Sequence, residues 1–116
     1  MMKDHNNKKT YVFDIDGTIC SNTGGQYEKA EPFMDRIEII NNLHDDGNII
    51  LFLTARGMGR FNNDKKMSEF SFLQLTRTQL DSWGVKYHEI FLGKPAGDYY
   101  IDDKGIKDED FFNTRN

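Results

Sequence analysis

Residues 10–18 read Thr-Tyr-Val-Phe-Asp-Ile-Asp-Gly-Thr, and this stretch decides what kind of sheet the chain builds. Its first four residues are β-branched or aromatic and the run stops at Asp14, which is typical of a strand covered on both faces. A second continuous apolar run, residues 49–53, has strand length and ends at Thr54. Between the two runs, residues 32–47 place apolar side chains at helical spacing, with Pro at the start and Gly just past the end. Two buried strands joined by a helix predict a βαβ unit with parallel strands.

The rest of the chain continues this alternation. Apolar side chains at helical spacing predict a second helix within residues 64–83. A third strand is expected over residues 85–92, a short fourth strand over residues 99–101, and a short helical turn within residues 106–112. This order predicts an α/β fold built on an open parallel sheet, whose ligands bind at the carboxyl ends of the strands.

Length, composition and charge limit the classes of protein. The 116 residues are enough for one domain of the usual ~100–150 residues, and a 37% apolar share is compatible with a packed core. The net charge of −4 argues against nucleic acid as the main partner. No run approaches the ~18 apolar residues of a membrane span, and a single cysteine cannot form an internal disulfide. We expect a cytoplasmic protein with no membrane partner, in which a flexible leader, residues 1–9, precedes one domain over residues 10–116.

Two acidic pairs follow predicted strands. The alternation of an extended segment points Asp14 and Asp16 the same way before Gly17 lets the chain turn. Asp102 and Asp103 follow the predicted fourth strand, so four carboxylates are expected to converge at one edge of the sheet. An ordinary Asp-Gly turn with solvated acidic side chains explains the first pair equally well when it is taken alone.

Four carboxylates in one place require a counter-charge. Two unit charges 4 Å apart repel by about 4 kcal/mol at an effective dielectric constant of about 20. Either some of the carboxyl groups stay protonated, or a hard cation neutralises them. Mg²⁺ is the expected cofactor, because it binds one or two carboxylates and keeps a position for a substrate phosphate. No histidine or cysteine set has the spacing of a zinc or copper site.

Hydrogen-bond donors follow two other strands. Thr54, Ala55 and Arg56 come at the end of the second strand, and Lys94 comes after the third. Thr54 alone could be a helix N-cap, and Lys94 alone could be a solvated surface lysine. Their shared placement at strand ends favours a site that binds phosphate oxygens.

Four segments of the sequence resemble the motifs of a known family. Asp14-Ile15-Asp16-Gly17-Thr18 resembles the first motif, Asp-x-Asp-x-Thr, of the haloacid dehalogenase (HAD) superfamily. Residues 52–56 resemble the second motif, Lys94 the third, and residues 100–103 the acidic fourth motif, in the family's order. The resemblance spans roughly residues 10–105. It implies a Rossmann-like, HAD-like domain of three α/β/α layers and a Mg²⁺-dependent phosphatase; response-regulator receivers place similar residues in another order.

The resemblance also implies residue roles. Asp14 would be the nucleophile that forms an aspartyl-phosphate, and Asp16 the general acid and then the general base. Thr54 and Lys94 would hold the phosphoryl oxygens, with Ala55 and Arg56 as further substrate-binding residues. Asp14, Asp102 and the backbone carbonyl of Asp16 would hold the metal ion, with Asp103 beside them as a direct or indirect ligand. The second aspartate of the first motif favours phosphate chemistry over dehalogenation.

The gaps between motifs are too short for a cap domain, so we expect a capless enzyme. Its open site would suit an extended substrate or a neighbouring subunit of a homo-oligomer that covers it. Residues 21–27 are consistent with a short hairpin flap, and residues 56–60 place two arginines on a flexible loop. We expect His44 and His88 to have no role in function and Cys20 to pack beneath the flap.

The expected activity is hydrolysis of a phosphomonoester, a small molecule such as a sugar phosphate. Residues 87–111 look most like small bacterial capless phosphatases of capsule or surface-polysaccharide biosynthesis. Two alternatives stay open: phosphoryl transfer to an acceptor other than water, and a catalytically idle binding module that works with a partner enzyme. The presence of Asp16, Thr54 and Lys94 favours an enzyme over the idle module.

Overall fold

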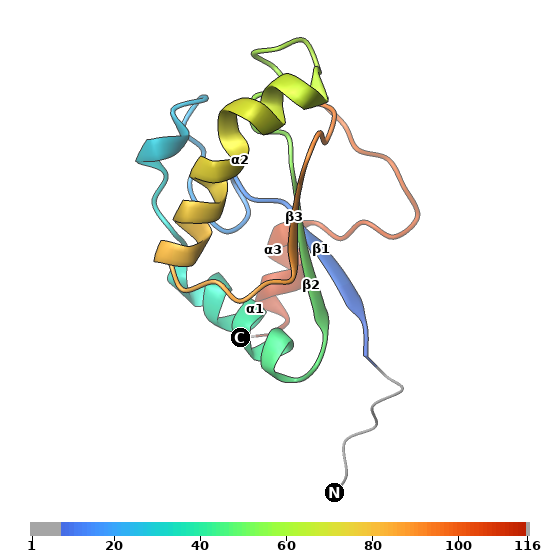
Figure 1. Cartoon of the computed structure of the whole chain (residues 1–116). Helices are drawn as coiled ribbons and strands as arrows, with labels where there is room; N and C mark the ends of the chain where they lie inside the picture. Colours follow the sequence, from blue (N-terminus) through green and yellow to red (C-terminus); the bar gives the residue numbers. More distant parts are fainter. Residues whose placement is uncertain (1–7, 116) are drawn as a thin grey trace, which may run out of the picture.

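The computed structural model describes residues 8–115 and is built on three parallel strands (Figure 1). They are β1 (Thr10–Phe13), β2 (Ile49–Thr54) and β3 (Glu89–Leu92), in the order β1-β2-β3. The register sets Phe13 beside Phe52 and Phe52 beside Ile90. The three strands confirm the predicted parallel βαβ arrangement, although β3 begins later than the expected residue 85.

Within residues 8–115, three α-helices and one short 3₁₀-helix connect or follow the strands. They are η2 (Tyr27–Lys29), α1 (Met34–Asp45), α2 (Lys65–Ser82) and α3 (Asp108–Asn113). The side chain of Asp64 caps α2, because its Oδ1 accepts a hydrogen bond from the Met67 N–H at 3.1 Å. The helices α1, α2 and α3 confirm the predicted helices within residues 32–47, 64–83 and 106–112, with ends that differ by one or two residues.

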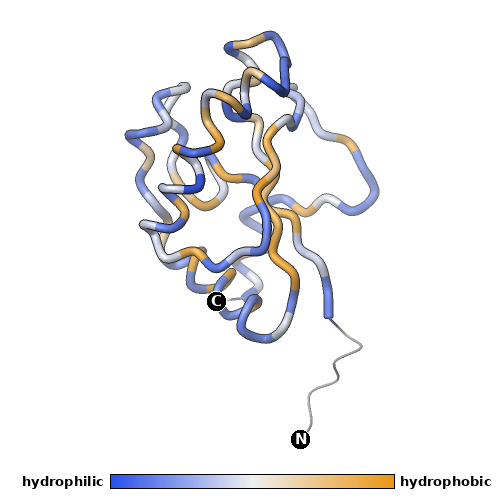
Figure 2. The backbone as a smooth tube through the Cα atoms, in the orientation of Figure 1, coloured by the Kyte–Doolittle hydropathy of each residue, from blue (hydrophilic) through white to orange (hydrophobic). Residues whose placement is uncertain are grey.

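The core lies between one face of the sheet and the helices. Phe13 and Phe52 point into it, and the rings of Phe111 and Phe112 on α3 lie 5.5 and 5.9 Å from that of Phe13. Figure 2 shows a long hydrophobic run in the middle of the sheet, where β2 lies. Burial of these aromatic side chains supplies the main stabilisation, since each removes a large apolar area from water. Further core side chains come from α1, α2, β2 and β3 and from the segments after β1 and after α2: Ile37, Ile40, Phe72, Leu80, Ile50, Ile90, Leu92, Ile15, Ile19, Cys20 and Val85.

The open parallel α/β sheet without a cap is confirmed for the part of the chain that the structure describes. Within residues 8–115 the packed side chains of all three α-helices belong to the core on one face of the sheet. The opposite face carries Val12, Ile49 and Phe91, which are 58%, 43% and 45% exposed, so these helices do not form a second outer layer. Of the predicted leader, residues 1–7 lie outside the described residues.

The predicted fourth strand is wrong. Residues 93–107 form a loop that leaves the sheet on the side away from α2 (Figure 1), and β1 remains at the edge of the sheet. Tyr99 and Ile101 are 85% and 94% exposed. Tyr100 instead makes local contacts, since its hydroxyl donates to the Pro95 carbonyl at 2.7 Å. A three-residue run is too short to secure pairing when such local bonds compete with it.

No helix in the described part of the chain is long and apolar enough to cross a membrane.

Candidate active site

The carboxyl ends of the three strands bring the predicted residues to one edge of the sheet. Asp14 follows β1 directly, Thr54 is the last residue of β2, and Lys94 follows β3 after one glycine. The Lys94 N–H donates to the Thr54 carbonyl at 3.2 Å, which ties the ends of β2 and β3 together. A pocket of about 270 Å³ opens here, lined by Asp14, Asp16, Asn22, Thr23, Gly24, Gly25, Tyr27, Thr54, Ala55 and Arg56.

Asp14 is a half-buried carboxyl group directly after β1. Burial raises its pKa above the ordinary value, and the positive charge of Lys94 is the largest influence in the other direction. The nearby charge of Asp16 also raises the pKa of Asp14. Asp14 is therefore a poorly hydrated carboxyl group whose ionised form depends on Lys94, an arrangement suited to a nucleophile.

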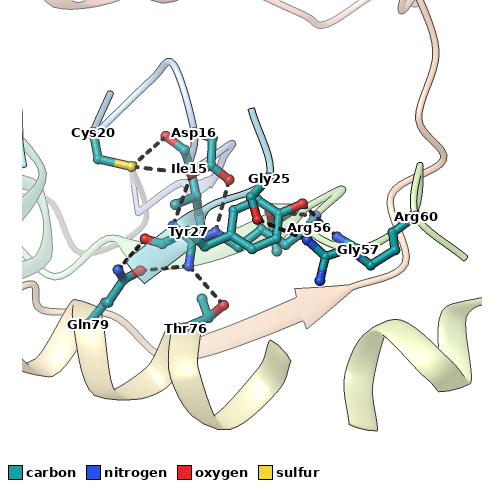
Figure 3. A network of polar contacts seen from close by, with 11 residues as sticks. Ile15, Asp16, Cys20, Gly25, Tyr27, Arg56, Gly57, Arg60, Thr76 and Gln79 are labelled. Carbon is teal, nitrogen blue, oxygen red and sulfur yellow. Dashed lines mark hydrogen bonds and ion pairs between the residues drawn. The ribbon is translucent and has the colours of Figure 1, made fainter. Parts of the chain in front are cut away.

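Asp16 is held by a bidentate ion pair (Figure 3). Its Oδ2 accepts from Arg56 Nε at 2.9 Å and its Oδ1 accepts from Arg56 Nη2 at 3.0 Å. The Cys20 thiol also lies 3.6 Å from Oδ1. Both carboxylate oxygens are thus occupied by donors, which is the arrangement that guanidinium and ionised carboxylate favour.

Arg56 lies elsewhere than the sequence predicted. Its side chain is among the largest fully buried groups, with 1% of the residue exposed, whereas we expected it on a flexible loop facing substrate. Its Nη1 donates to Thr76 Oγ1 at 3.1 Å and to Gln79 Oε1 at 2.7 Å, both on α2. The guanidinium carbon also lies 4.9 Å from the centre of the Tyr27 ring. The expected exposure on a flexible loop is wrong, because the partners on α2 that bury Arg56 are 20 or more positions away in the sequence. Arg56 nevertheless lines the pocket, and its contact with substrate stays a prediction.

Thr54 and Lys94 keep groups that could bind phosphate oxygens. Thr54 is 1% exposed, and its Oγ1 accepts from the Arg56 N–H at 3.1 Å. That bond uses a lone pair, so the hydroxyl proton can still be donated. The Lys94 ammonium group lies 4.2 Å from the centre of the Tyr100 ring. Thr54 is not the N-cap of a helix, which removes the simpler explanation for that residue.

Asp102 and Asp103 do not join the first acidic pair. Both are exposed, and Asp102 Oδ1 accepts from the backbone N–H groups of Lys104 and Gly105. These two bonds lower the pKa of Asp102. Across residues 8–115 no group of three or more acidic, histidine or cysteine side chains could hold a metal ion. The predicted convergence of four carboxylates is therefore not formed, because it depended on the fourth strand.

The segment over the pocket resembles the predicted flap in part. Cys20 and Pro32 form an antiparallel bridge at its base, and η2 occupies its returning arm. Arg60 Nη2 donates to the Gly25 carbonyl at 3.1 Å and so ties the flap to the loop after β2. Thr23 was not singled out from the sequence, yet its buried hydroxyl oxygen has no hydrogen-bond partner among residues 8–115 and the residue lines the pocket. Thr76 and Gln79 were also missed, because nothing in the helical spacing of α2 marks them.

The residues expected to be structural are accounted for by packing. Cys20 is fully buried beneath the flap, and burial together with the charge of Asp16 raises the pKa of its thiol to about 12. His44 and His88 stack with ring centres 4.7 Å apart, a contact that their separation in the sequence hid. His88 Nδ1 accepts from the Ile50 N–H at 3.1 Å, which attaches the residue before β3 to β2.

Comparison with known proteins yields one informative relative. No protein-family model and no curated protein matches the chain. The chain is similar to a solved structure of an MCSG target from Vibrio cholerae, with 31% sequence identity and a TM-score of 0.82. The likeness covers 90% of this chain and 87% of the other. The two proteins therefore belong to one family, for which this relative supplies the fold and not an activity.

Proposed function

We propose that the protein is a phosphomonoester hydrolase in which Asp14 is the nucleophile, as its likeness to HAD phosphatases implies. The observation that carries the proposal is the environment of Asp14, a half-buried carboxyl group whose pKa is raised by desolvation and lowered by the charge of Lys94, in a pocket shared with Asp16 and Thr54. A sugar phosphate or a related metabolite is the proposed substrate class.

The reaction has two displacement steps at phosphorus. In the first, an Asp14 oxygen forms a bond to phosphorus while the bond to the leaving oxygen breaks, and Asp16 gives that oxygen a proton. In the second, Asp16 takes a proton from water, the water oxygen attacks phosphorus, and the bond to Asp14 breaks. Inorganic phosphate leaves, Asp14 is a carboxylate again, and Asp16 again holds the proton that the first step requires.

Asp16 must loosen its bond to Arg56 to take part. A carboxylate that accepts hydrogen bonds at both oxygens has no proton to give, so Asp16 first has to take up a proton from solvent at an oxygen that has left the Arg56 fork, and it then gives this proton to the leaving oxygen. Leaving-group binding in the pocket supplies a competing partner for that oxygen. We expect the second oxygen to stay on the guanidinium and keep the carboxyl group aimed.

Donors around the pocket would stabilise the transferring phosphoryl group. Negative charge spreads over its three equatorial oxygens, and fixed donors and cations favour that state. The Thr54 hydroxyl and the Lys94 ammonium group are the donors that the strand ends supply. Ala55 lines the same pocket, which supports a role in substrate binding.

Dependence on Mg²⁺ is a separate part of the proposal. Two acidic residues line the pocket and one of them is paired with Arg56, so the arrangement of residues 8–115 does not fit a Mg²⁺ ion, and no step above runs through one. Asp102 and Asp103 could join Asp14 only if residues 99–101 left their loop and paired with the open edge of β1. Phosphate release by protein treated with EDTA, with and without added Mg²⁺, tests this part alone.

A second candidate is the idle binding module, favoured by the occupied state of both Asp16 oxygens. A panel of aryl phosphates, sugar phosphates and nucleotides separates it from the enzyme. Phosphate release above background from any member supports the hydrolase, and its absence from the whole panel favours the module. Analysis of products with added sugar alcohols separates hydrolysis from phosphoryl transfer to another acceptor.

A further inference from the structure

We propose that Arg56 is a positioning residue that aims Asp16 and does not bind the substrate phosphate. The inference rests on the proposed function and changes the role that the sequence alone suggested for Arg56. Arg56 would act through Asp16, and its effect would be on the chemical step.

Most N–H groups of Arg56 already donate hydrogen bonds within the protein. Nε and Nη2 each donate to Asp16, and Nη1 donates to both Thr76 and Gln79. An arginine has five N–H donors, so four of them have partners within the described residues. A bound phosphate would have to displace Asp16 or the α2 contacts to gain a bidentate hold.

The guanidinium group of Arg56 is also buried and packed against an aromatic ring. The side chain is 0% exposed, and the Tyr27 ring lies across it at 4.9 Å. Burial of a charge is costly unless the charge is paired and hydrogen-bonded, and Asp16 supplies that pair. Guanidinium and carboxylate thereby stabilise each other in one orientation, as a residue that aims another must do.

Hydrogen bonds also connect Arg56 through Gln79 to Tyr27 in the flap (Figure 3). Gln79 accepts from Arg56 and donates through Nε2 to the Tyr27 carbonyl at 2.6 Å. The Tyr27 hydroxyl in turn accepts from the Gly57 N–H at 2.8 Å. The position of Asp16 is therefore coupled through Arg56 to α2 and to the segment that covers the pocket.

The test compares Arg56→Lys and Arg56→Gln with Arg77→Gln, a matched change of an exposed arginine on the same helix as Thr76. With an aryl phosphate as substrate, we expect both Arg56 variants to lose at least tenfold in kcat while KM changes by less than about threefold. The inhibition constant for inorganic phosphate should also stay within about threefold. The Arg77 variant should match the parent in all three quantities.

Two outcomes would overturn the proposal. A rise of tenfold or more in KM and in the phosphate inhibition constant would make Arg56 a phosphate ligand. Unchanged kcat in a folded variant would reduce Arg56 to a purely structural residue. If neither Arg56 variant folds, Thr76→Val removes one anchor of the guanidinium, and we expect it to lower kcat by about two- to fivefold at unchanged KM; an unchanged kcat would count against the proposal.

The single cysteine provides a readout that does not require turnover. The Cys20 thiol contacts Asp16 and is buried, so it should react slowly with a thiol reagent in the parent protein. We expect Arg56→Lys, compared at equal thermal stability, to raise the labelling rate at least fivefold. Equal labelling rates would show that Arg56 does not hold Asp16. Absence of phosphate release by the parent would refute the hydrolase and leave this result standing.

Discussion

The two acidic pairs of the chain have the same chemistry and opposite surroundings. Asp14 and Asp16 lie at the end of a strand whose neighbour is fixed by backbone hydrogen bonds, and each faces a basic side chain. Asp102 and Asp103 lie in an exposed loop, where Asp102 is satisfied by the backbone of its own turn. Burial raises the pKa of Asp14, whereas local N–H groups lower that of Asp102.

Burial and neighbouring charges decide whether an aspartate side chain is suited to act as a nucleophile. A carboxyl group that is buried beside a lysine has lost water and gained a charge partner, so it can react with an incoming electrophile. A carboxyl group in a solvated turn is already stabilised in its ionised form by water and by backbone N–H groups. Substitutions at Asp14, Asp102, Gly57 and Gly97 test this difference.

The largest effect is expected at Asp14. Asp14→Asn removes the nucleophile, and we expect phosphate release from an aryl phosphate to fall by at least a thousandfold. Asp35→Asn, an exposed change on α1, should leave the rate within about twofold and serves as the control. Turnover by the Asp14 variant above a hundredth of the parent rate would refute its assignment.

Asp102→Asn asks whether the second pair ever joins the first. If residues 99–101 pair with β1 in the presence of Mg²⁺, we expect a loss of more than tenfold and a weaker dependence on Mg²⁺. Asp98→Asn, in the same exposed loop, is the matched control. Equal rates for the two loop variants and the parent would mean that the loop takes no part in the reaction.

Gly57→Ala and Gly97→Ala compare the packed and the solvated region through their stability. Gly57 has φ +79°, and a Cβ there would lie 2.7 Å from a Phe72 ring carbon, so we expect a loss of about 1–3 kcal/mol. At Gly97 the nearest atom would be 3.8 Å away, an ordinary contact, so the change should stay within about 0.5 kcal/mol. Thermal unfolding measures both. Similar melting temperatures for the two variants would contradict the packing described at Gly57.

The smallest effect is in the pH dependence of stability. Because the folded-state pKa of Asp14 is raised, its ionisation costs stability, a cost absent below the unfolded value near 3.8 and growing as pH rises through the folded value. We therefore expect Asp14→Asn to raise Tm at pH 7 and to leave it unchanged at pH 3. For Asp102 the sign is opposite, since its pKa is lowered, and Asp102→Asn should not raise Tm at pH 7. A higher Tm for the Asp102 variant alone would reverse the contrast.

Much of the fold could be predicted from the sequence because its strands are continuous apolar runs. Residues 49–53 and the run before Asp14 have no competing helical spacing, and the helix between them has clear ends. Residues 99–101 failed because Tyr100 finds bonds within its own loop, which a count of β-forming residues cannot reveal. A local pattern predicts an element well only when burial supports it.

The residues of the candidate site that follow strands could also be predicted from the sequence. Asp14, Thr54 and Lys94 come together because strand ends meet at one edge, which follows from the order of the elements. The partners of Arg56 could not be predicted, because they depend on how α2 rotates to face the pocket. The Thr23 hydroxyl depends in the same way on how the flap folds back over the site.

Chemical trapping of the carboxyl group that carries phosphate tests the role of Asp14 as the nucleophile. The protein is mixed with an aryl phosphate, quenched, and reduced with borohydride, which converts an aspartyl-phosphate into homoserine, and the modified peptide is identified by mass spectrometry. We expect the change at Asp14 in the parent and its absence in Asp14→Asn. Modification of another residue, or phosphate release with no modified aspartate, would contradict the account.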